Sequence, residues 1–207
     1  MSDLREKIIQ ASLHLFSEKG FHGVSVNDIV KYCDTSKGGF YHHFKSKDEL
    51  LYVIHDLFIT YVLNEANEIK QKYDQPIEQL YEILKSHVRV FDLYNEHIVV
   101  FYQEQKYLKE EYEELIKQKR DEFKNIIMDV IKEGQNIGQF RNEIPTTITG
   151  MSILGIVNWT YQWYKKDGPK TIDQIASTYI DIIFRGILTE QSLETYINSK
   201  LSQQLNF

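Results

Sequence analysis

The segment Ser36–Lys47 concentrates residue types that bind phosphate groups, since lysines, hydroxyl groups and imidazoles follow one another within a short stretch. If a short helix starts after the first serine, Lys37 and Tyr41 share one stripe of it at i,i+4 spacing. Phe40 and Phe44 then share a separate, apolar stripe. Such a helix docks one side against a protein core and offers an ammonium and a phenol on the other, which is the chemistry of a surface that binds an anionic polymer.

A second short helix is expected immediately before this one. Ser25–Cys33 begins with a serine at a capping position, and only Asp34 and Thr35 separate it from Ser36. Two short helices joined by a tight turn form a helix-turn-helix, whose second helix enters the major groove of DNA. The small residues Gly38–Gly39 would allow the backbone of that helix to approach DNA closely.

Residues 5–51 resemble the N-terminal domain of TetR-type transcriptional repressors. The resemblance is a spaced constellation over the whole segment, which makes it more specific than one short motif. It implies a three-helix domain that binds double-stranded operator DNA. The matching positions are Ile9, Ala11, Leu15, Phe16, Gly20, Phe21, Ser25, Val26, Asp28, Ile29, Ser36, Lys37, Gly38, Phe40, Tyr41, His43, Phe44, Lys47, Glu49 and Leu50.

The chain departs from the TetR pattern at two places. Cys33–Thr35 stands where the family usually has Ala-Gly-Val, and because Asp tolerates the left-handed backbone we expect the turn to form around Asp34. Gly39 stands where the family usually has threonine, which removes a hydroxyl that could contact phosphate or base. Lys45–Lys47 could also be an ordinary solvated connection. The residues predicted to bind DNA are Ser25, Ser36, Lys37, Gly38, Gly39, Tyr41, His42 and Lys47.

The basic character of this segment is local. The chain has 207 residues and a formal charge of -6, which argues against indiscriminate nucleic-acid binding. Residues 1–50 hold seven Lys or Arg and seven Asp or Glu, so the negative excess lies entirely beyond them. Residues 31–47 hold four lysines against one aspartate. This distribution predicts a protein that presents one basic face to DNA while an acidic body points away.

Several other kinds of site are disfavoured. Cys33 is the single cysteine, so no internal disulfide can form, and we expect it to pack as a small apolar residue. His42 and His43 do not face the same way on a helix and have no carboxylate or thiolate at ligand spacing, so neither a metal site nor a cofactor is predicted. The charged N-terminus is unlike a signal peptide, and no apolar run reaches the ~20 residues of a membrane span. We therefore expect a cytoplasmic protein without a membrane partner.

Long periodic segments rich in Leu, Ile, Glu, Lys and Tyr, with only three prolines, predict an all-α fold. We expect a three-helix helix-turn-helix DNA-binding domain at residues 1–47, followed by a helical ligand-binding and dimerisation domain at residues 48–207, without a flexible linker. The expected helices cover residues 3–19, 25–33, 36–44, 46–73, 76–94, 109–133, 145–167 and 171–188, with a short apolar segment at 97–106 and a tail at 190–207 that forms a last helix or frays.

A homodimer is expected because a two-fold protein matches a palindromic operator. In TetR-like proteins the two C-terminal helices pack with their symmetry mates as a four-helix bundle, and the resemblance implies the same here. These helices carry more apolar surface than the core of one monomer needs to bury, although part of that surface can face the core. The apolar residues concerned are Ile148, Met151, Ile153, Leu154, Ile156, Val157, Ile172, Ile175, Ala176, Tyr179, Ile180, Ile183, Phe184 and Ile187.

The segment Gly155–Gly168 resembles a helix of the FadR-like branch of the family, whose members respond to acyl-coenzyme A (acyl-CoA) thioesters. Its tryptophans lie one turn apart beside two amides, which suits a small-molecule effector with an apolar tail and a polar head. The tryptophans could equally pack in the core or the dimer, and an aromatic or drug-like ligand of an efflux or stress regulator would fit the same residues. The candidate ligand-binding residues are Phe101, Tyr102, Tyr107, Phe123, Asn158, Trp159, Gln162 and Trp163, with Arg89, Arg120, Lys165 or Lys166 as cations for a coenzyme A diphosphate.

The sequence therefore predicts a dimeric DNA-binding repressor that a small hydrophobic or acyl-CoA-type effector releases from its operator. An alternative from another class is an all-helical enzyme acting on acyl thioesters, which needs positioned acid and base groups. Glu104, His87 and His97 are the candidates outside the N-terminal domain. No nucleophile elbow, phosphate loop, paired-carboxylate motif or metal-ligand spacing accompanies them, so we expect no enzymatic activity.

Overall fold

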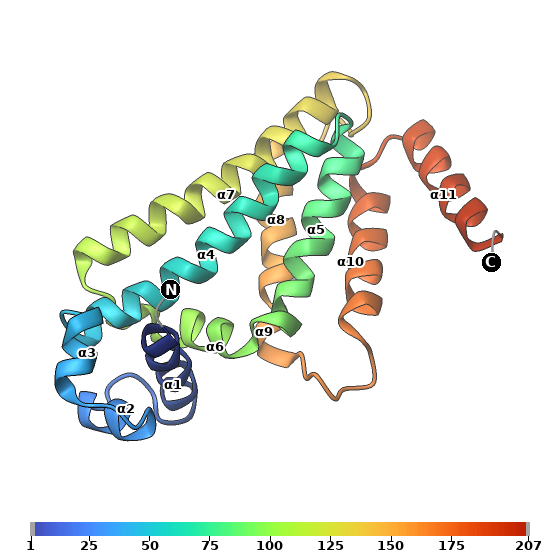
Figure 1. Ribbon diagram of the computed structural model, residues 1–207. Helices are drawn as coiled ribbons and strands as arrows, with labels where there is room; N and C mark the ends of the chain where they lie inside the picture. Colours follow the sequence, from blue (N-terminus) through green and yellow to red (C-terminus); the bar gives the residue numbers. More distant parts are fainter. Residues whose placement is uncertain (1–2, 206–207) are drawn as a thin grey trace. The chain divides into compact units, whose positions relative to one another are not determined.

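The computed structural model describes residues 3–205 and confirms the all-α prediction, because helices follow one another along the chain and no β-strand occurs among those residues (Figure 1). An isolated bridge pairs Phe140 with Leu188. The helices are α1 (Asp3–Lys19), α2 (Val26–Tyr32), α3 (Lys37–His43), α4 (Lys47–Lys72), α5 (Pro76–Leu93), α6 (Asn95–Glu104), the 3-10 turn η1 (Gln105–Tyr107), α7 (Glu110–Asn136), α8 (Thr146–Asn158), α9 (Thr160–Trp163), α10 (Ile172–Ile187) and α11 (Glu190–Leu205).

The chain divides into two compact units. The first contains the residues up to Tyr61 together with Tyr94–Arg120, and the second contains Val62–Leu93 together with the residues from Asp121 onward. The helices α4 and α7 are each continuous and contribute residues to both units.

In the first unit α1, α2 and α3 pack on one another, and α6 packs on α1. The side chains of Phe16, Ile29, Phe40 and Phe44 are almost fully buried in this core. Burial of each such side chain contributes about 1.5–3 kcal/mol. Because α2 and α3 have only seven residues each, this packing, and not helix propensity, holds them in place.

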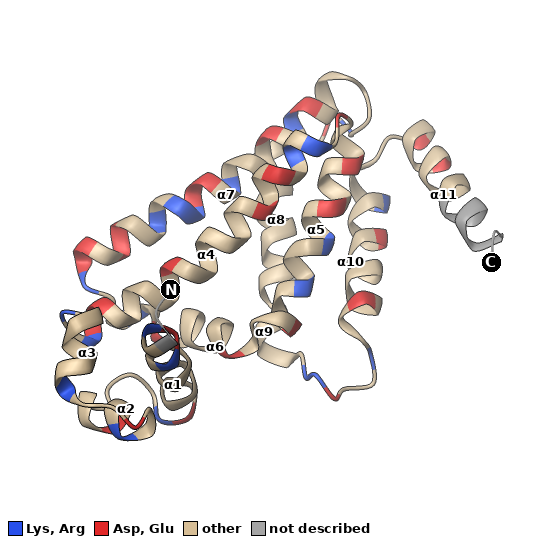
Figure 2. Cartoon of the chain, viewed as in Figure 1, with Lys and Arg blue, Asp and Glu red and all other residues tan. Residues whose placement is uncertain are grey.

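In the second unit α5, α8 and α10 run side by side (Figure 1). Their shared core contains Leu84 and Val88 of α5, Val157 of α8, and Ile180 and Phe184 of α10, all nearly inaccessible to solvent. The helix α8 carries no charged residue, in contrast to α7, which carries both signs along its length (Figure 2).

One expected helix is broken. The segment predicted as a single helix over residues 145–167 forms α8 and α9, which meet at Trp159. The N–H of Trp159 is shared between the carbonyls of Gly155 and Val157, which tightens the turn. The next residue, Thr160, is fully buried, and its hydroxyl lies 3.1 Å from that of Tyr179. This tertiary contact redirects the chain after α8.

A second difference concerns the end of α7, which we expected at Gly134. The helix runs through this glycine and ends at Asn136. A Cβ at Gly134 would lie 2.3 Å from Cδ2 of Phe140, so glycine is needed to admit the phenyl ring and does not end the helix. Gly138, with φ of +77°, reverses the chain soon afterwards. The predicted tail forms α11, and its residues 206 and 207 lie outside the described residues.

Candidate nucleic-acid interface and effector cleft

The helix α3 presents predicted DNA-binding residues to solvent. The Ser36 hydroxyl caps it by accepting a hydrogen bond from the N–H of the third helical residue at 3.1 Å. Phe40 is buried on the inner side, whereas Lys37, Tyr41 and His42 are exposed, with 53% of Tyr41 accessible. An ammonium, a phenol and an imidazole therefore lie where phosphates or base edges can reach them.

The turn before α3 has the predicted geometry. Asp34 adopts φ of +51°, so an aspartate occupies the left-handed position that glycine often fills. At the start of α2, Ser25 Oγ accepts the Asp28 N–H at 3.2 Å and the Asp28 carboxylate accepts the Ser25 N–H at 2.8 Å. The Ser25 hydroxyl also donates a hydrogen bond to the Asp28 carboxylate at 2.5 Å, and this bond, together with the one from the Ser25 N–H, holds the pKa of Asp28 below its usual value. Ser25 thus has a capping role in addition to its predicted DNA contact.

The two glycines of α3 have different surroundings. A Cβ at Gly39 would lie 2.7 Å from Thr35 Oγ1 and 3.4 Å from a methyl carbon of Leu4, so a side chain there would need the threonine hydroxyl to move. A Cβ at Gly38 would meet only Ser36 Oγ, at an ordinary 3.5 Å. A side chain at Gly39 would therefore crowd atoms of the protein itself. The absence of a side chain at Gly38 instead leaves space at the surface of the helix.

Lys47, at the start of α4, is anchored inside the first unit. Its Nζ donates hydrogen bonds to the carbonyl oxygens of Phe21 at 2.7 Å and Val24 at 2.6 Å, and lies 4.1 Å from the centre of the Phe21 ring. Partial burial lowers the pKa of Lys47. An ammonium has three N–H groups, so one remains for the phosphate contact that the sequence predicts.

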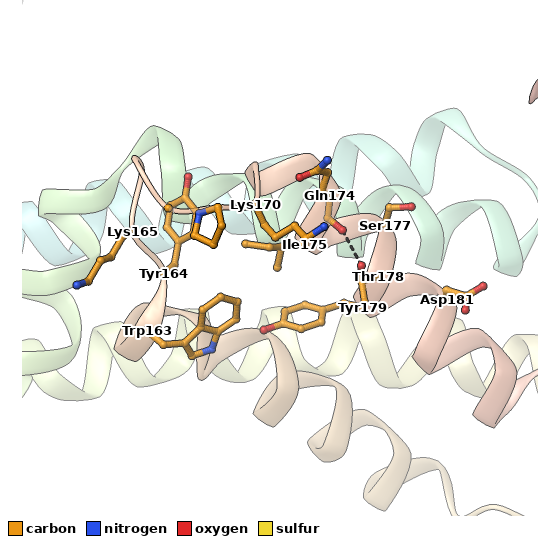
Figure 3. Close-up of a pocket in the computed structure, with 12 residues that line it drawn as sticks. Trp163, Tyr164, Lys165, Lys170, Gln174, Ile175, Ser177, Thr178, Tyr179 and Asp181 are labelled. Carbon is orange, nitrogen blue, oxygen red and sulfur yellow. Dashed lines mark hydrogen bonds between the residues drawn. The ribbon is translucent and has the colours of Figure 1, made fainter.

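A cleft of about 800 Å³ opens in the second unit and is lined by residues of α9, the following loop and α10 (Figure 3). Trp163, Ile175 and Tyr179 give it aromatic and aliphatic surface, and Lys165 and Lys170 belong to its lining. In Figure 3 Lys165 points away from the other side chains drawn, whereas Lys170 extends over Ile175. A cleft of this size and apolar character is typical of small-molecule sites.

Of the predicted ligand-binding residues in the second unit, Trp163 lines this cleft. Trp159 lies at the junction of α8 and α9 with 63% of its surface exposed. Asn158 is half-buried, and its Oδ1 has no hydrogen-bond partner among the described residues. Gln162 is exposed and donates a hydrogen bond to the Tyr161 hydroxyl.

Phe123, also in the second unit, is buried beside a separate small cavity. The remaining three candidates belong to the first unit. Phe101 is buried against His55, and the half-buried Tyr102 lies beside it, with ring centres 5.4 Å apart. Tyr107 stacks on the Phe21 ring at 6.1 Å. The eight predicted ligand-binding residues are thus distributed over both units.

Several residues of the cleft were not predicted from the sequence as ligand contacts. Tyr164 lines the cleft and donates a hydrogen bond to the Asp92 carboxylate at 2.7 Å, and burial together with this neighbour raises the pKa of Tyr164 to about 12. Lys170 and Tyr179 were likewise not singled out as ligand contacts. The sequence does contain one local feature that could have indicated these residues. A loop with Gly168 and Pro169 leads directly into the capped start of α10, and this places the cleft residues near one another.

The helices α8 and α10 expose apolar side chains. Ile148 and Met151 of α8 are 62% and 52% exposed, and Ile182 of α10 is 57% exposed. A Cβ at Gly155 or Gly186 would meet no atom within 4 Å, so both helices leave open surface. The apolar residues named from the sequence divide accordingly: Ile148, Met151 and Ile156 are exposed, Leu154, Ile172 and Tyr179 are half-buried, and Ile153, Val157, Ile175, Ala176, Ile180, Ile183, Phe184 and Ile187 are buried.

The part of the chain that the structure describes lacks two other kinds of feature. No group of three or more His, Cys, Asp or Glu side chains is arranged to hold a metal ion. No helix in this part combines the length and apolar content needed to cross a membrane.

Two family models match the chain. Residues 8–53 match the model described as bacterial regulatory proteins, tetR family, which covers the helix-turn-helix. Residues 73–187 match the model described as tetracyclin repressor-like, C-terminal domain. The second match alone spans more than half of the chain.

Individual transcriptional regulators are also similar to this chain in sequence and in fold. The transcriptional repressor KstR2 of Mycolicibacterium smegmatis is 23% identical over 188 residues, which cover 90% of this chain and 92% of KstR2. The structure of PfmR, a TetR-family regulator of Thermus thermophilus, is 30% identical with a TM-score of 0.81, over 86% of this chain and 97% of PfmR. The structure of AibR in complex with isovaleryl coenzyme A and operator DNA is 22% identical with a TM-score of 0.79, over 88% of this chain and 98% of AibR. The chain therefore belongs to the tetR family of bacterial transcriptional regulators.

Proposed function

We propose that this regulator represses transcription by binding a palindromic double-stranded operator through α3. The observation that carries the proposal is the exposed group Lys37, Tyr41 and His42 on a helix whose inner side is fixed by buried Phe40. In a helix-turn-helix the first turn of the second helix approaches base edges. Ser25, Ser36, Gly38, Gly39 and Lys47 complete the proposed contact surface.

Residues 1–47 are the proposed DNA-binding part, and residues 48–207 the proposed ligand-binding and dimerisation part. The protein would act in the cytoplasm, where bacterial DNA is found. The exposed apolar residues of α8 and α10 support a homodimer, because large apolar patches mark interaction surfaces and a two-fold axis lets one patch serve both protomers. Two recognition helices held roughly 34 Å apart would read successive major grooves of a palindrome.

The proposed effector is an acyl-CoA thioester bound in the cleft beside Trp163. The aromatic side chains of the cleft suit an acyl chain or an adenine ring, and Lys170 supplies a cation for a diphosphate. AibR, whose fold this chain shares, is bound to isovaleryl coenzyme A and operator DNA in its own structure. Release of DNA requires that the effector bind more tightly to the conformation that does not bind DNA. The continuous helix α4 joins the two units through the backbone.

Selection from a random duplex library, followed by fluorescence anisotropy with the enriched sequence, tests the DNA-binding part. We expect a palindrome whose half-sites lie about one helical turn apart. Isovaleryl-CoA or octanoyl-CoA should then release the DNA, whereas coenzyme A and the free acids at equal concentration should not. Chromatography after incubation should recover the thioester intact, and turnover would instead support an enzyme.

Two variants test the cleft. Trp163→Ala and Lys170→Ala should each raise the thioester concentration needed for release about tenfold, the effect of about 1.4 kcal/mol of lost contact, with unchanged operator affinity. Lys132→Ala, at an exposed lysine of α7 that does not line the cleft, is the matched control. Release by a neutral aromatic compound without any dependence on Lys170 would favour the drug-responsive alternative.

A further inference from the structure

A second cavity in the second unit is distinct from the cleft, and the two share no lining residue. It measures about 10 Å³ and is enclosed by residues of α4, α5 and α7. Its polar lining consists of Glu65, Ser86 and His87, and the rest of the lining is aliphatic apart from the Phe123 ring. Such a volume holds about one water-sized group.

His87 brings an unsatisfied polar atom to this cavity. The side chain is only 7% exposed, and its Nδ1 is buried without a hydrogen-bond partner in the described part of the chain. Aromatic rings surround it, with the Phe123 centroid at 4.8 Å and the Phe91 centroid at 6.2 Å. A buried nitrogen without a partner is energetically unfavourable, so a group that completes its hydrogen bond gains affinity.

The charges at the cavity limit what that group can be. Burial lowers the pKa of His87 to about 4, so the imidazole is neutral near pH 7. The Glu65 carboxylate already accepts a hydrogen bond from Ser86 Oγ at 3.2 Å. A carboxylate or phosphate from a ligand would meet this negative charge without a balancing cation among the lining residues. A neutral oxygen meets no such penalty, and a neutral imidazole can donate to it or accept from it.

We propose that this cavity receives the hydroxyl or keto oxygen of an otherwise apolar ligand and that His87 Nδ1 forms the hydrogen bond to it. The oxygen can belong to the acyl group of a thioester, in which case the inference rests on the proposed function, or to a free alcohol or ketone. Because the cavity fits one small group, the carbon skeleton of the ligand must displace neighbouring side chains such as Ile83 and Phe123. Occupied and empty states would then differ in the packing of α5 and α7.

Nitrogen-15 NMR of protein labelled at its seven histidines tests the inference directly. The His87 signals are identified by their absence in His87→Phe, or in His87→Gln if the first variant does not fold. Cyclohexanone and cyclohexanol should shift the His87 Nδ1 signal in a saturable way. Toluene, a ring of similar size without oxygen, should bind about tenfold more weakly and leave Nδ1 unperturbed.

The variants test whether the preference depends on this imidazole. His87→Phe or His87→Gln should abolish or alter the preference for the oxygenated rings, as measured by the shift in melting temperature with ligand concentration. His55→Phe is the matched control, because His55 is also buried but belongs to the first unit. It should retain the preference.

A second experiment, with thioesters as probes, distinguishes the two possible sources of the oxygen. Octanoyl-CoA is compared with octanoyl-CoA derivatives hydroxylated at successive carbons, in the wild type and in His87→Phe. A preference for one hydroxylated thioester that is lost in the variant supports the thioester source. Response to the free alcohol and ketone alone supports the cavity and overturns the thioester effector. Thioesters that release DNA without any preference for a hydroxylated acyl chain would exclude the thioester as the source of the oxygen. If no probe moves the His87 signal, because only water enters the cavity, the inference is overturned.

Discussion

The Glu104 carboxylate accepts a hydrogen bond from the backbone N–H of Phe21 at 3.0 Å, within the first unit. Glu104 ends α6 and is only 7% exposed, and Phe21 lies in the loop between α1 and α2. Lys47 of α4 donates to the carbonyl oxygen of the same residue. Both backbone polar groups of Phe21 therefore have side-chain partners, so α4 and α6 together hold the loop that leads into the helix-turn-helix.

Glu104→Ala should lower the free energy of unfolding by about 1–3 kcal/mol, because the buried N–H of Phe21 loses its acceptor. Glu104→Gln should cost less, since an amide oxygen can still accept. Urea denaturation measures both changes. Glu111→Ala, at an exposed glutamate of α7, is the control and should change stability by no more than about 0.5 kcal/mol. Equal effects of the two alanine variants would show that the Glu104 hydrogen bond does not stabilise the fold.

Lys37→Ala should weaken operator binding without changing stability, because the side chain is exposed on α3. If Lys37 of each protomer in the proposed dimer neutralises one phosphate, two contacts are lost, and the slope of log K against log salt should become shallower by about 1.8. Anisotropy titrations over a range of KCl concentrations measure this slope. An unchanged slope would remove Lys37 from the list of phosphate contacts.

Lys47→Ala serves as the contrasting variant in the same experiment. It should lower both operator affinity and the free energy of unfolding, because the carbonyl groups of Phe21 and Val24 lose their donor. A loss of affinity with full stability would mean that Lys47 acts on DNA alone.

The helix-turn-helix was predictable because its determinants are local. Ser25 and Ser36 each accept a hydrogen bond from the N–H of the residue three positions later, and the apolar spacing of Phe40 and Phe44 fixes the inner side of α3. Asp34 stands in the turn segment where the family usually has Ala-Gly-Val, and an aspartate tolerates the left-handed backbone that it adopts there. In each case a few consecutive residues carry the necessary information.

The break at Trp159 and the cleft depend on contacts between distant segments, which no local pattern encodes. The hydroxyls of Thr160 and Tyr179 meet across 19 residues, and Tyr164 binds Asp92 across 72. The anchoring role of Lys47 was hidden for the same reason, because its partners Phe21 and Val24 precede it by more than 20 residues.

Ile182→Glu should convert the proposed homodimer to a monomer. The isoleucine is 57% exposed on α10, and a carboxylate placed there would be buried unpaired in a symmetric interface. Sedimentation velocity measures whether the protein is a dimer or a monomer. Operator affinity should fall when the dimer is lost, because a palindrome needs two recognition helices. Ile137→Glu is the matched control, since Ile137 is 56% exposed just beyond α7 and belongs to neither α8 nor α10. A fully dimeric Ile182→Glu protein would place the interface elsewhere.

Stability should fall as the pH decreases, because of two buried histidines. Burial lowers the pKa of both His55 and His87 to about 4, against about 6.5 for an unfolded chain. Between these values the unfolded chain binds more protons, so the stabilisation is complete above pH 6.5 and is lost progressively toward pH 4. From pH 7.5 to pH 5 each histidine should account for a loss of about 2 kcal/mol.

Urea denaturation of the wild type at these two pH values measures the effect, with the unfolding of each unit followed separately if the transitions do not coincide. His55→Phe and His87→Phe should each reduce the loss of unfolding free energy on acidification by about 2 kcal/mol, because a phenyl ring takes up no proton in the unfolded chain. His42→Ala, at an exposed position of α3, is the control for the loss of a histidine that is not buried. If His55→Phe and His87→Phe lose as much stability on acidification as the wild type does, protonation of other groups drives the loss.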